Sequence, residues 1–293
     1  MSARPPIIQR QVDIEFSDVP PGPWFPAGGP LETMFNAASL SFPPTERFFI
    51  AAVRNYQNRI TEPGLADEVR KFIYQEAMHN KVHIDCNTML SRGNGKCRVA
   101  EKVSVGTFRV LSLLPKAFRL SLSSALEHFT AMAADTLLQY PDAFCEIVPA
   151  PVAQMWLWHA AEETEHKAVC FDVHKAIFGS GVKAYLNRVG GMLLATPIFL
   201  FVLIFVTAAI LSIGKSRTSA PKVARIVPTD PRDPARFLGR NMLSLLRELI
   251  PWRLYFSYYR PSFHPWDHDN AHYIVEWKQR YPNFGISGGV ATV

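Results

Sequence analysis

The sequence has few of the features that mark a disulfide-bonded, secreted or nucleic-acid-binding protein. Only 4 of its 293 residues are cysteine, and no two have Cys-x-x-Cys spacing, so we expect reduced thiols rather than a disulfide framework. The first 18 residues contain no apolar run, which argues against a secretory signal peptide. The net charge is +6, but no Lys/Arg run exceeds a pair. We therefore expect no nucleic-acid partner, and an anionic membrane surface explains the charge better.

Charge is also absent from residues 189–214, a stretch longer than the roughly 20 residues that cross a bilayer. We expect residues 183–215 to form an apolar helix or hairpin that inserts into a membrane, with Pro197 as a kink or turn. A buried core helix is the alternative. Because basic residues flank both ends, the positive-inside rule does not orient the segment.

Two Glu-x-x-His steps are the most informative motifs that the sequence does contain. Glu76 and His79 form the first step, and Glu163 and His166 form the second. Residues three apart lie on one face of an α-helix, one turn from each other. Each step follows an earlier expected helix that carries a glutamate on its inward face, namely Glu46 and Glu127.

This arrangement predicts an all-α fold, a ferritin-like four-helix bundle made of two Glu…Glu-x-x-His hairpins joined by a long crossover. We expect bundle helices over residues 43–59, 66–91, 117–139 and 150–177, with Pro43 and Pro44 in the first helical turn. The predicted organisation is an irregular segment at 1–42, the bundle at 43–182, the apolar segment at 183–215, and at 216–293 a linker, an amphipathic helix and a tail. That helix could lie at a membrane interface or pack on the bundle.

The expected ligand set of four carboxylates and two imidazoles would neutralise two divalent ions and suits iron best, with manganese or zinc as alternatives. Taken singly, Glu46 could only complement a helix dipole and Glu127 could be a surface residue. Two further histidines share the helical faces: His159 is expected as an additional ligand, and for His83 a ligand, a supporting contact and plain packing stay open. Asp172 is expected to orient a ligand histidine.

Several segments resemble the bacterial family described as predicted metal-dependent hydrolases, which belongs with the ferritin-like proteins. They are Glu46-Arg-Phe-Phe, residues 76–83, residues 156–172 and Phe263-His-Pro-Trp266. The spacing of His159, Glu163 and His166 is also similar to the fourth helix of di-iron arylamine N-oxygenases. That second resemblance implies His159 as a seventh ligand.

These observations lead to three functional hypotheses. The first is a membrane-associated di-iron oxygenase or oxidase that uses O2 on a hydrophobic or lipid-like substrate. The second is a metal-dependent hydrolase in which the same ions activate water. The third is a non-catalytic metal-binding or lipid-binding protein. We expect attachment to a bacterial inner membrane with the metal domain in the cytoplasm, and a homodimer is possible. The roles of His264 and His268 in the tail stay open.

Overall fold

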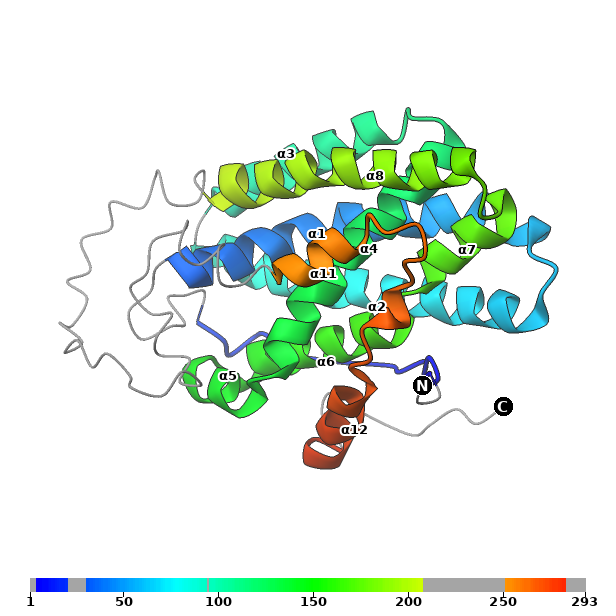
Figure 1. Cartoon of the computed structure of the whole chain (residues 1–293). Coiled ribbons are helices and arrows are strands. Elements are labelled where there is room, and N and C mark those ends of the chain that lie inside the picture. The colour runs from blue at the N-terminus through cyan, green and yellow to red at the C-terminus, as the bar shows by residue number, and fades with distance from the viewer. Residues whose placement is uncertain (1–3, 21–29, 94, 208–250, 283–293) are drawn as a thin grey trace.

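The computed structural model describes residues 4–20, 30–93, 95–207 and 251–282, and the regular elements in these ranges are helical (Figure 1). Four long helices form the centre: α1 (Pro30–Arg54), α2 (Pro63–Gly93), α4 (Lys116–Leu138) and α6 (Ala150–His166). Shorter elements among the described residues are η1 (Gln57–Arg59), α3 (Cys97–Leu111), α5 (Pro141–Ile147), α7 (Val169–Phe178), α8 (Val182–Phe201), η2 (Val202–Val206), α11 (Trp252–Ser257), η4 (Pro265–Asp267) and α12 (Ala271–Arg280). The all-α prediction is confirmed.

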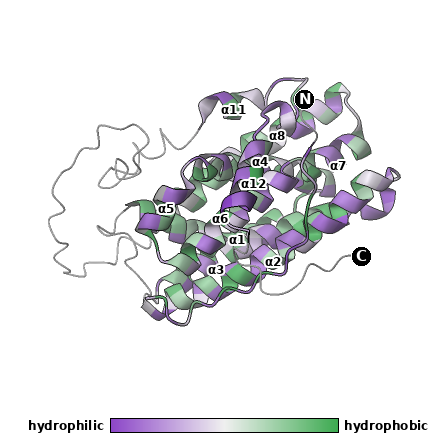
Figure 2. Cartoon of the chain, turned by 90° about the horizontal axis from the view of Figure 1, so that it is seen from below, coloured by the Kyte–Doolittle hydropathy of each residue, from purple (hydrophilic) through white to green (hydrophobic). Residues whose placement is uncertain are grey.

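The four long helices pack together as a bundle. Helix α1 packs on α2 and α4, and α6 packs on α4 and α2. Polar contacts show that α2 runs antiparallel to both neighbours: Ser39 contacts Asn87 while Pro43 contacts Asn80, and Gln75 contacts His166 while His83 contacts His159. Figure 2 shows that hydrophobic and hydrophilic residues are mixed along these helices.

Helix α3 is the crossover that the sequence predicted between the two hairpins. Its 15 residues extend about 22 Å at 1.5 Å per residue, so it carries the chain back along the bundle. It packs mainly on α1. Leu111 ends α3 and Pro115 precedes α4, where a proline starts a helix without losing a hydrogen bond.

Helix α1 begins earlier than the sequence predicted. We expected an irregular segment up to residue 42 and a helix start at Pro43 and Pro44, but both prolines lie inside α1. Pro43 has no N–H for the carbonyl of Ser39, four residues earlier. The side-chain amide of Asn87 on α2 donates to that carbonyl instead, at 3.0 Å. A neighbouring helix thus satisfies the group that the proline leaves free, and the helix continues.

The last predicted bundle helix, 150–177, is divided in two. Helix α6 ends at His166 and α7 begins at Val169, with no Gly or Pro at the junction. Lys167 lies at this junction, buried, and its Nζ donates to the His268 carbonyl and to Asn270 Oδ1. The break between α6 and α7 therefore coincides with contacts to the C-terminal segment, which the sequence near residue 167 does not predict.

Helix α8 and η2 contain the described part of the predicted membrane segment. The Phe129 and Phe199 rings stack at 4.5 Å, and Ser121 Oγ donates to the Asn187 carbonyl, so α8 runs parallel to α4 along the outside of the bundle (Figure 1). A Cβ on Gly191 would lie 2.6 Å from the Ser121 carbonyl oxygen, so only glycine permits this approach. Residues 208–215, the predicted linker and most of the predicted amphipathic helix lie outside the described residues.

The described ends of the chain cover the α6 side of the bundle. The segment 4–20 runs along α6, where Ile8 N–H donates to Glu165 (Figure 1). Two clusters of buried apolar side chains fill the interior, one containing Val82 and Trp158 and the other containing Phe72 and Leu122. Polar side chains between Phe72 and Val82 on α2 separate the clusters, and the candidate site lies there.

Candidate metal centre

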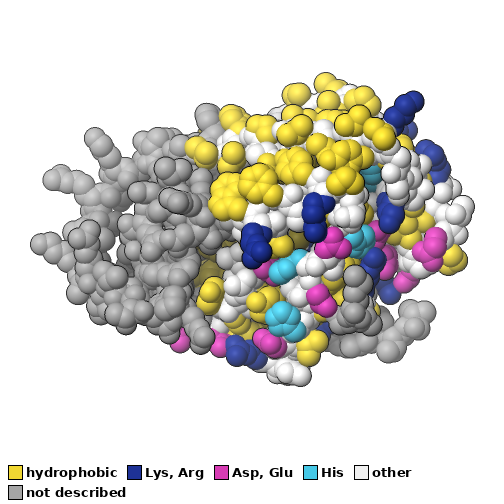
Figure 3. All heavy atoms as spheres, viewed as in Figure 1, with side chains coloured by type: hydrophobic (Ala, Val, Ile, Leu, Met, Phe, Trp, Pro, Cys, Tyr) yellow, Lys and Arg dark blue, Asp and Glu magenta, His cyan; other side chains and the backbone are white. Residues whose placement is uncertain are grey.

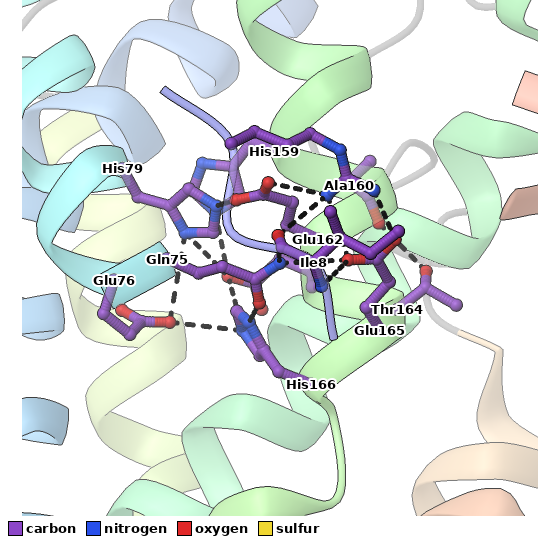
Figure 4. A network of polar contacts seen from close by, with 12 residues as sticks. Ile8, Gln75, Glu76, His79, His159, Ala160, Glu162, Thr164, Glu165 and His166 are labelled. Atoms are coloured by element: carbon purple, nitrogen blue, oxygen red, sulfur yellow. Dashed lines mark hydrogen bonds and ion pairs between the residues drawn. The ribbon is translucent and has the colours of Figure 1, made fainter. Parts of the chain in front are cut away.

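The structure brings together all the residues that the sequence predicted as metal ligands. Glu46 comes from α1, Glu127 from α4, and the two Glu-x-x-His steps from α2 and α6. All of them, together with His83 and His159, are at most 3 % exposed. Figure 4 shows Glu76 and His79 on α2 facing His159 and His166 on α6. The bundle thus converges on a buried, carboxylate-rich cluster.

The cluster contains many buried polar atoms that make no hydrogen bond. They are both carboxylate oxygens of Glu46, Glu76 and Glu127, together with Glu163 Oε2, His79 Nδ1 and His166 Nε2. His166 Nε2 lies 3.2 Å from Glu76 Oε1 and 3.6 Å from Glu127 Oε2, but without hydrogen-bond geometry. Leaving such groups unpaired costs about 1–3 kcal/mol each, and more for charged groups. This donor set fits cations as its missing partners.

The electrostatics of the cluster require the same kind of partner. Among the described residues, no Lys or Arg forms an ion pair with Glu46, Glu76, Glu127 or Glu163. Burial, and then the neighbouring carboxylates Glu76 and Glu163, raise the pKa of Glu46 well above its ordinary value. Burial and the same two carboxylates raise the pKa of Glu127. A cation beside such a carboxylate would favour its charged form and offset the cost of burying it.

The donor atoms fall into overlapping groups that could each hold an ion. One group is Glu46, Glu76 and His79, and another is Glu76, Glu127 and His166. A third group joins His79 to His159 and Glu163. Glu163 Oε1 lies 3.7 Å from His79 Nδ1 and 3.5 Å from His166 Nε2. Glu76 and Glu163 are therefore shared between the two sides of the cluster.

Both histidines of the Glu-x-x-His steps are held by a hydrogen bond at the ring nitrogen that faces away from the cluster. His79 Nε2 lies 3.0 Å from Glu162 Oε2, and His166 Nδ1 lies 2.8 Å from Gln75 Oε1. Gln75 Oε1 accepts, and so does Glu162 when it is ionised, so each ring then donates and keeps the lone pair of its other nitrogen toward the carboxylates. A partner of this kind orients a ligand histidine and raises its basicity.

A buried ion-pair network behind α6 fixes those two partners. Arg10 donates to Glu162 at 2.7 Å and to Glu165 at 2.5 and 2.9 Å. Gln75 donates to Glu165 at 3.0 Å and to the carbonyl of Ile8 at 2.9 Å. Burial raises the pKa of Glu162 to about 7, although Arg10 counteracts that effect. The N-terminal segment thereby contributes to the position of both ligand histidines.

His159 and His83 form a hydrogen-bonded chain that leads away from the cluster to α1. The Ser39 hydroxyl donates to Asn87 Oδ1 at 2.8 Å and lies 2.9 Å from His83 Nδ1. Because that hydroxyl has only one hydrogen, His83 Nδ1 is the donor to it. In a neutral ring His83 Nε2 then accepts from His159 Nδ1, 2.7 Å away. Both nitrogens of His83 thus have hydrogen-bond partners, while His83 also belongs to a group with Glu46 and His159 that could hold an ion, so a supporting role and a ligand role both stay open for it.

The same assignment leaves His159 Nε2 with a lone pair 2.9 Å from Glu163 Oε1. Two lone pairs at that distance repel unless a proton or a metal ion lies between or beside them. His159 is therefore placed where an additional ligand could lie, and its ligand role stays a prediction. Its ring also stacks on His79, with centroids 4.1 Å apart.

The remaining predicted residues lie apart from the cluster. Asp172 was expected to orient a ligand histidine, but its partners are Arg4 at 2.9 Å and His264 at 2.9 Å. It belongs to α7, beyond the break after His166, so the expected continuation of the helical face does not hold. His268 contacts Asp135. The tail histidines thus anchor the C-terminal segment to the bundle and are absent from the groups that could hold a metal.

An apolar pocket of about 280 Å³ reaches the cluster from one side. His159 and Glu163 lie in its wall, and most of the other lining residues are apolar side chains of α1, α4, α6 and α8. Burial and the adjacent glutamates, first Glu127, raise the pKa of the Cys170 thiol, so this cysteine stays neutral and does not compete as a ligand.

Sequence reasoning missed the residues that support the ligands. No role was predicted for Glu162 beside Glu163, yet both are buried. They share burial because α6 is enclosed by the bundle on one side and by segment 4–20 on the other. The adjacency of Gln75 to Glu76 and of Glu162 to Glu163 was the available signal. Nothing local marks Arg10 as their partner.

Comparisons with known proteins agree with this site. No curated protein and no solved structure matches the chain. A family model does match, over residues 8–269, which contain the cluster, its supporting residues and the pocket. The chain belongs to the family described as predicted metal-dependent hydrolase.

Proposed function

We propose that this protein is a dinuclear metal enzyme with a ferritin-like centre, and that hydrolysis of an apolar substrate is its reaction. The observation that supports it best is the set of buried, unpaired carboxylate and imidazole atoms that converge from four helices. Glu46 and His79 would hold one ion, and Glu127 and His166 the other. Glu76 and Glu163 would be shared between the two ions, and His159 would complete the first site.

The donor set favours hard or borderline divalent ions. Carboxylate oxygens and imidazoles suit iron, manganese and zinc, and thiolate is absent from the groups found among the described residues. When bound, such ions supply Lewis acidity and lower the pKa of coordinated water. Glu162 and Gln75 would hold His79 and His166 in their ligating tautomers, and the pocket would present an apolar substrate beside Glu163.

A second candidate reaction is oxidation by O2 with iron as the metal. Two observations favour it: the third histidine, His159, adjoins the cluster, and the pocket wall at Glu163 is otherwise mainly apolar. A mainly apolar wall offers few groups that could stabilise the charge that develops in hydrolysis. Hydrolysis stands first because it agrees with the description of the family.

Metal analysis tests the centre itself. Purified protein loaded anaerobically with Fe(II), or with Mn(II) or Zn(II), should retain two ions per chain, in line with the two groups that share Glu76. Glu76→Gln should lose most of the metal because it belongs to both groups. Glu146→Gln, a change at an exposed glutamate, should retain it. Equal metal content in both variants would refute the assignment.

The same preparations decide between the two reactions. Each loaded protein is offered chromogenic esters and amides with apolar acyl groups, and separately the Fe(II) form is exposed to O2. Ester or amide turnover that Glu76→Gln abolishes and Glu146→Gln retains supports the hydrolase. Rapid O2 consumption by the Fe(II) form, without turnover of esters or amides, would replace it with the oxidase.

A further inference from the structure

The pocket beside the metal centre is elongated along two helices. Its wall includes α1 residues from Leu31 to Thr45, α4 residues from Leu126 to Leu137, and Tyr140 beyond the end of α4. At 1.5 Å per residue, the α1 stretch corresponds to about 21 Å and the α4 stretch to about 16 Å. Thr45 and Leu126 directly precede the ligand candidates Glu46 and Glu127. One end of the pocket is therefore at the centre, and the other lies near Phe144 of α5.

The pocket offers almost nothing to a polar ligand along this length. Among the described residues of its wall there is no Lys or Arg. Its serine and threonine hydroxyls donate to carbonyls of their own helices: Ser41 to Ala37, Thr45 to Ser41, Thr130 to Glu127, and Thr136 to Met132. Because those hydrogens are already used, the wall presents mainly hydrocarbon, and the strongly polar end is the one formed by His159 and Glu163.

Aromatic rings and methyl groups limit the width of the pocket. Phe42 packs against His159 with centroids 4.7 Å apart, and Phe129 stacks on Phe199 of α8. Ala134 and Ala160, both buried, line it between these rings. A long space with small residues at intervals fits a flexible linear chain better than a fused ring system.

We propose that the pocket binds a linear alkyl chain, such as that of a fatty-acyl compound, with its polar end at His159 and Glu163. This inference deepens the proposed function, because it names the substrate class of the same centre. The chain would lie between α1 and α4, with its methyl end toward Leu31 and Tyr140. Burial of each methylene contributes about 0.8 kcal/mol, so affinity should rise with chain length until the pocket is full.

Chain-length dependence of binding tests the proposal without any turnover. The Zn-loaded protein is titrated by calorimetry with octanoate, dodecanoate and hexadecanoate. We expect affinity to increase at least tenfold from octanoate to hexadecanoate. Affinity that is independent of chain length would overturn the proposal. Octanol and dodecanol titrated into metal-free protein repeat the measurement without a carboxylate. If the loading experiment finds no bound metal, and alcohol binding to metal-free protein still rises with chain length, the proposed metal function fails and the pocket assignment stands.

Variants locate the chain within the pocket. Ala134 lies eight residues from Leu126 on α4, about 12 Å from the metal end. Ala134→Phe should therefore retain octanoate binding and weaken hexadecanoate binding at least tenfold. Ala38→Leu, from the α1 side of the wall, provides a milder block if the first variant does not fold. Ala51→Phe, at an exposed α1 position outside the wall, is the matched control. If the folded pocket variant, Ala134→Phe or its substitute Ala38→Leu, binds hexadecanoate as tightly as the control Ala51→Phe does, this placement of the chain is contradicted.

Discussion

At the scale of single residues, the centre consists of carboxylates in an environment that penalises their charge. Glu46 and Glu127 are buried with their oxygens unpaired, and burial raises the pKa of each. Glu163 differs, because His166 and His159 beside it outweigh burial and lower its pKa. The metal-free centre thus contains groups with opposite pH responses, and bound cations would remove the penalty on the first two.

In the metal-free protein, the contribution of Glu46 and Glu127 to stability should therefore fall as the pH rises. A raised folded pKa contributes stability below the ordinary value of 4.5, and that contribution is lost as the pH rises through the folded pKa of Glu46 and Glu127. Glu163 acts in the opposite direction below 4.5, and His79 and His83, whose pKa burial lowers, act in the opposite direction below 6.5. The contribution of the two glutamates is therefore measured as the difference between the wild type and a variant that lacks one of them.

Scanning calorimetry of chelated and metal-loaded protein from mildly acidic to neutral pH measures the difference. Glu46→Gln removes one titrating carboxylate, so the Tm of its chelated form should fall less, or rise more, than that of chelated wild-type protein over this range. The exposed Glu146→Gln should leave the slope unchanged. Parallel pH profiles of the chelated and loaded wild-type proteins would show that these carboxylates do not determine stability.

The sequence predicted the ligand candidates but not the residues that support them. Helical spacing places Glu76 with His79 on one face, and a fixed spacing is visible in a single sequence. The contacts of His79 with Glu162 and of His83 with Ser39 join different helices. Their rotation and depth depend on how the bundle packs, which periodicity does not specify.

At the scale of the helical element, α1 shows how tertiary contacts override a local signal. Two adjacent prolines predict a helix start, yet α1 continues through them because Asn87 donates to the Ser39 carbonyl. The Ser39 hydroxyl donates back to Asn87 Oδ1. This reciprocal pair of bonds joins α1 to α2 where the histidine chain ends.

Replacing Asn87 with leucine should destabilise the protein by about 1–3 kcal/mol. The reason is that the buried Ser39 carbonyl loses its donor and the Ser39 hydroxyl loses its acceptor. We expect a lower denaturant midpoint with an unchanged slope in chemical unfolding. Thr88→Ala, on the same helix, removes a hydroxyl that bonds only to its own helix and is the matched control. If Asn87→Leu unfolds at the midpoint of the control, the contact does not maintain α1.

Other elements follow the same pattern. The predicted crossover, the start of α4 near residue 117 and the end of α2 agree with the structure to within a few residues, because Pro and Gly mark these boundaries. The division between α6 and α7 has no such mark, and the early start of α1 contradicts the local one. Boundaries set by chain stereochemistry were predictable, and those set by distant contacts were not.

At the scale of the whole molecule, one side has an apolar surface formed by α8 and α11. Leu186, Leu193 and Phe201 on α8 and Trp252 and Phe256 on α11 are 47–62 % exposed. Figure 3 shows hydrophobic side chains gathered over these helices, with Lys and Arg at the margin. Helix α8 is one candidate span by length and composition, a test that buried helices of soluble proteins also pass.

The packing of α8 favours a surface-bound orientation over a spanning one. Arg188 on its inner face is buried, donates to the carbonyls of Tyr258 and Arg260, and lies over the Tyr258 ring. Because α8 lies along α4, a bilayer-spanning α8 would have to separate from the bundle and expose that arginine to lipid. We therefore expect α8 and α11 to lie in the membrane interface, beside the pocket wall that Phe199 and Pro251 help to form.

Liposome flotation tests this orientation. Wild-type protein should float with vesicles that contain anionic lipid, and carbonate should release it, whereas a spanning segment would resist carbonate. The double change Trp252→Ser and Phe256→Ser should weaken binding by about tenfold or more, since burial of one large apolar side chain contributes about 1.5–3 kcal/mol. Val275→Ser on α12, 53 % exposed and on the far side of the bundle from α8, is the control (Figure 1). Binding at the interface depends on the exposed apolar area of one face, so equal losses in the α11 variant and the control would exclude α11 as the contact. If the wild-type protein does not float with the vesicles, the expected membrane binding is wrong.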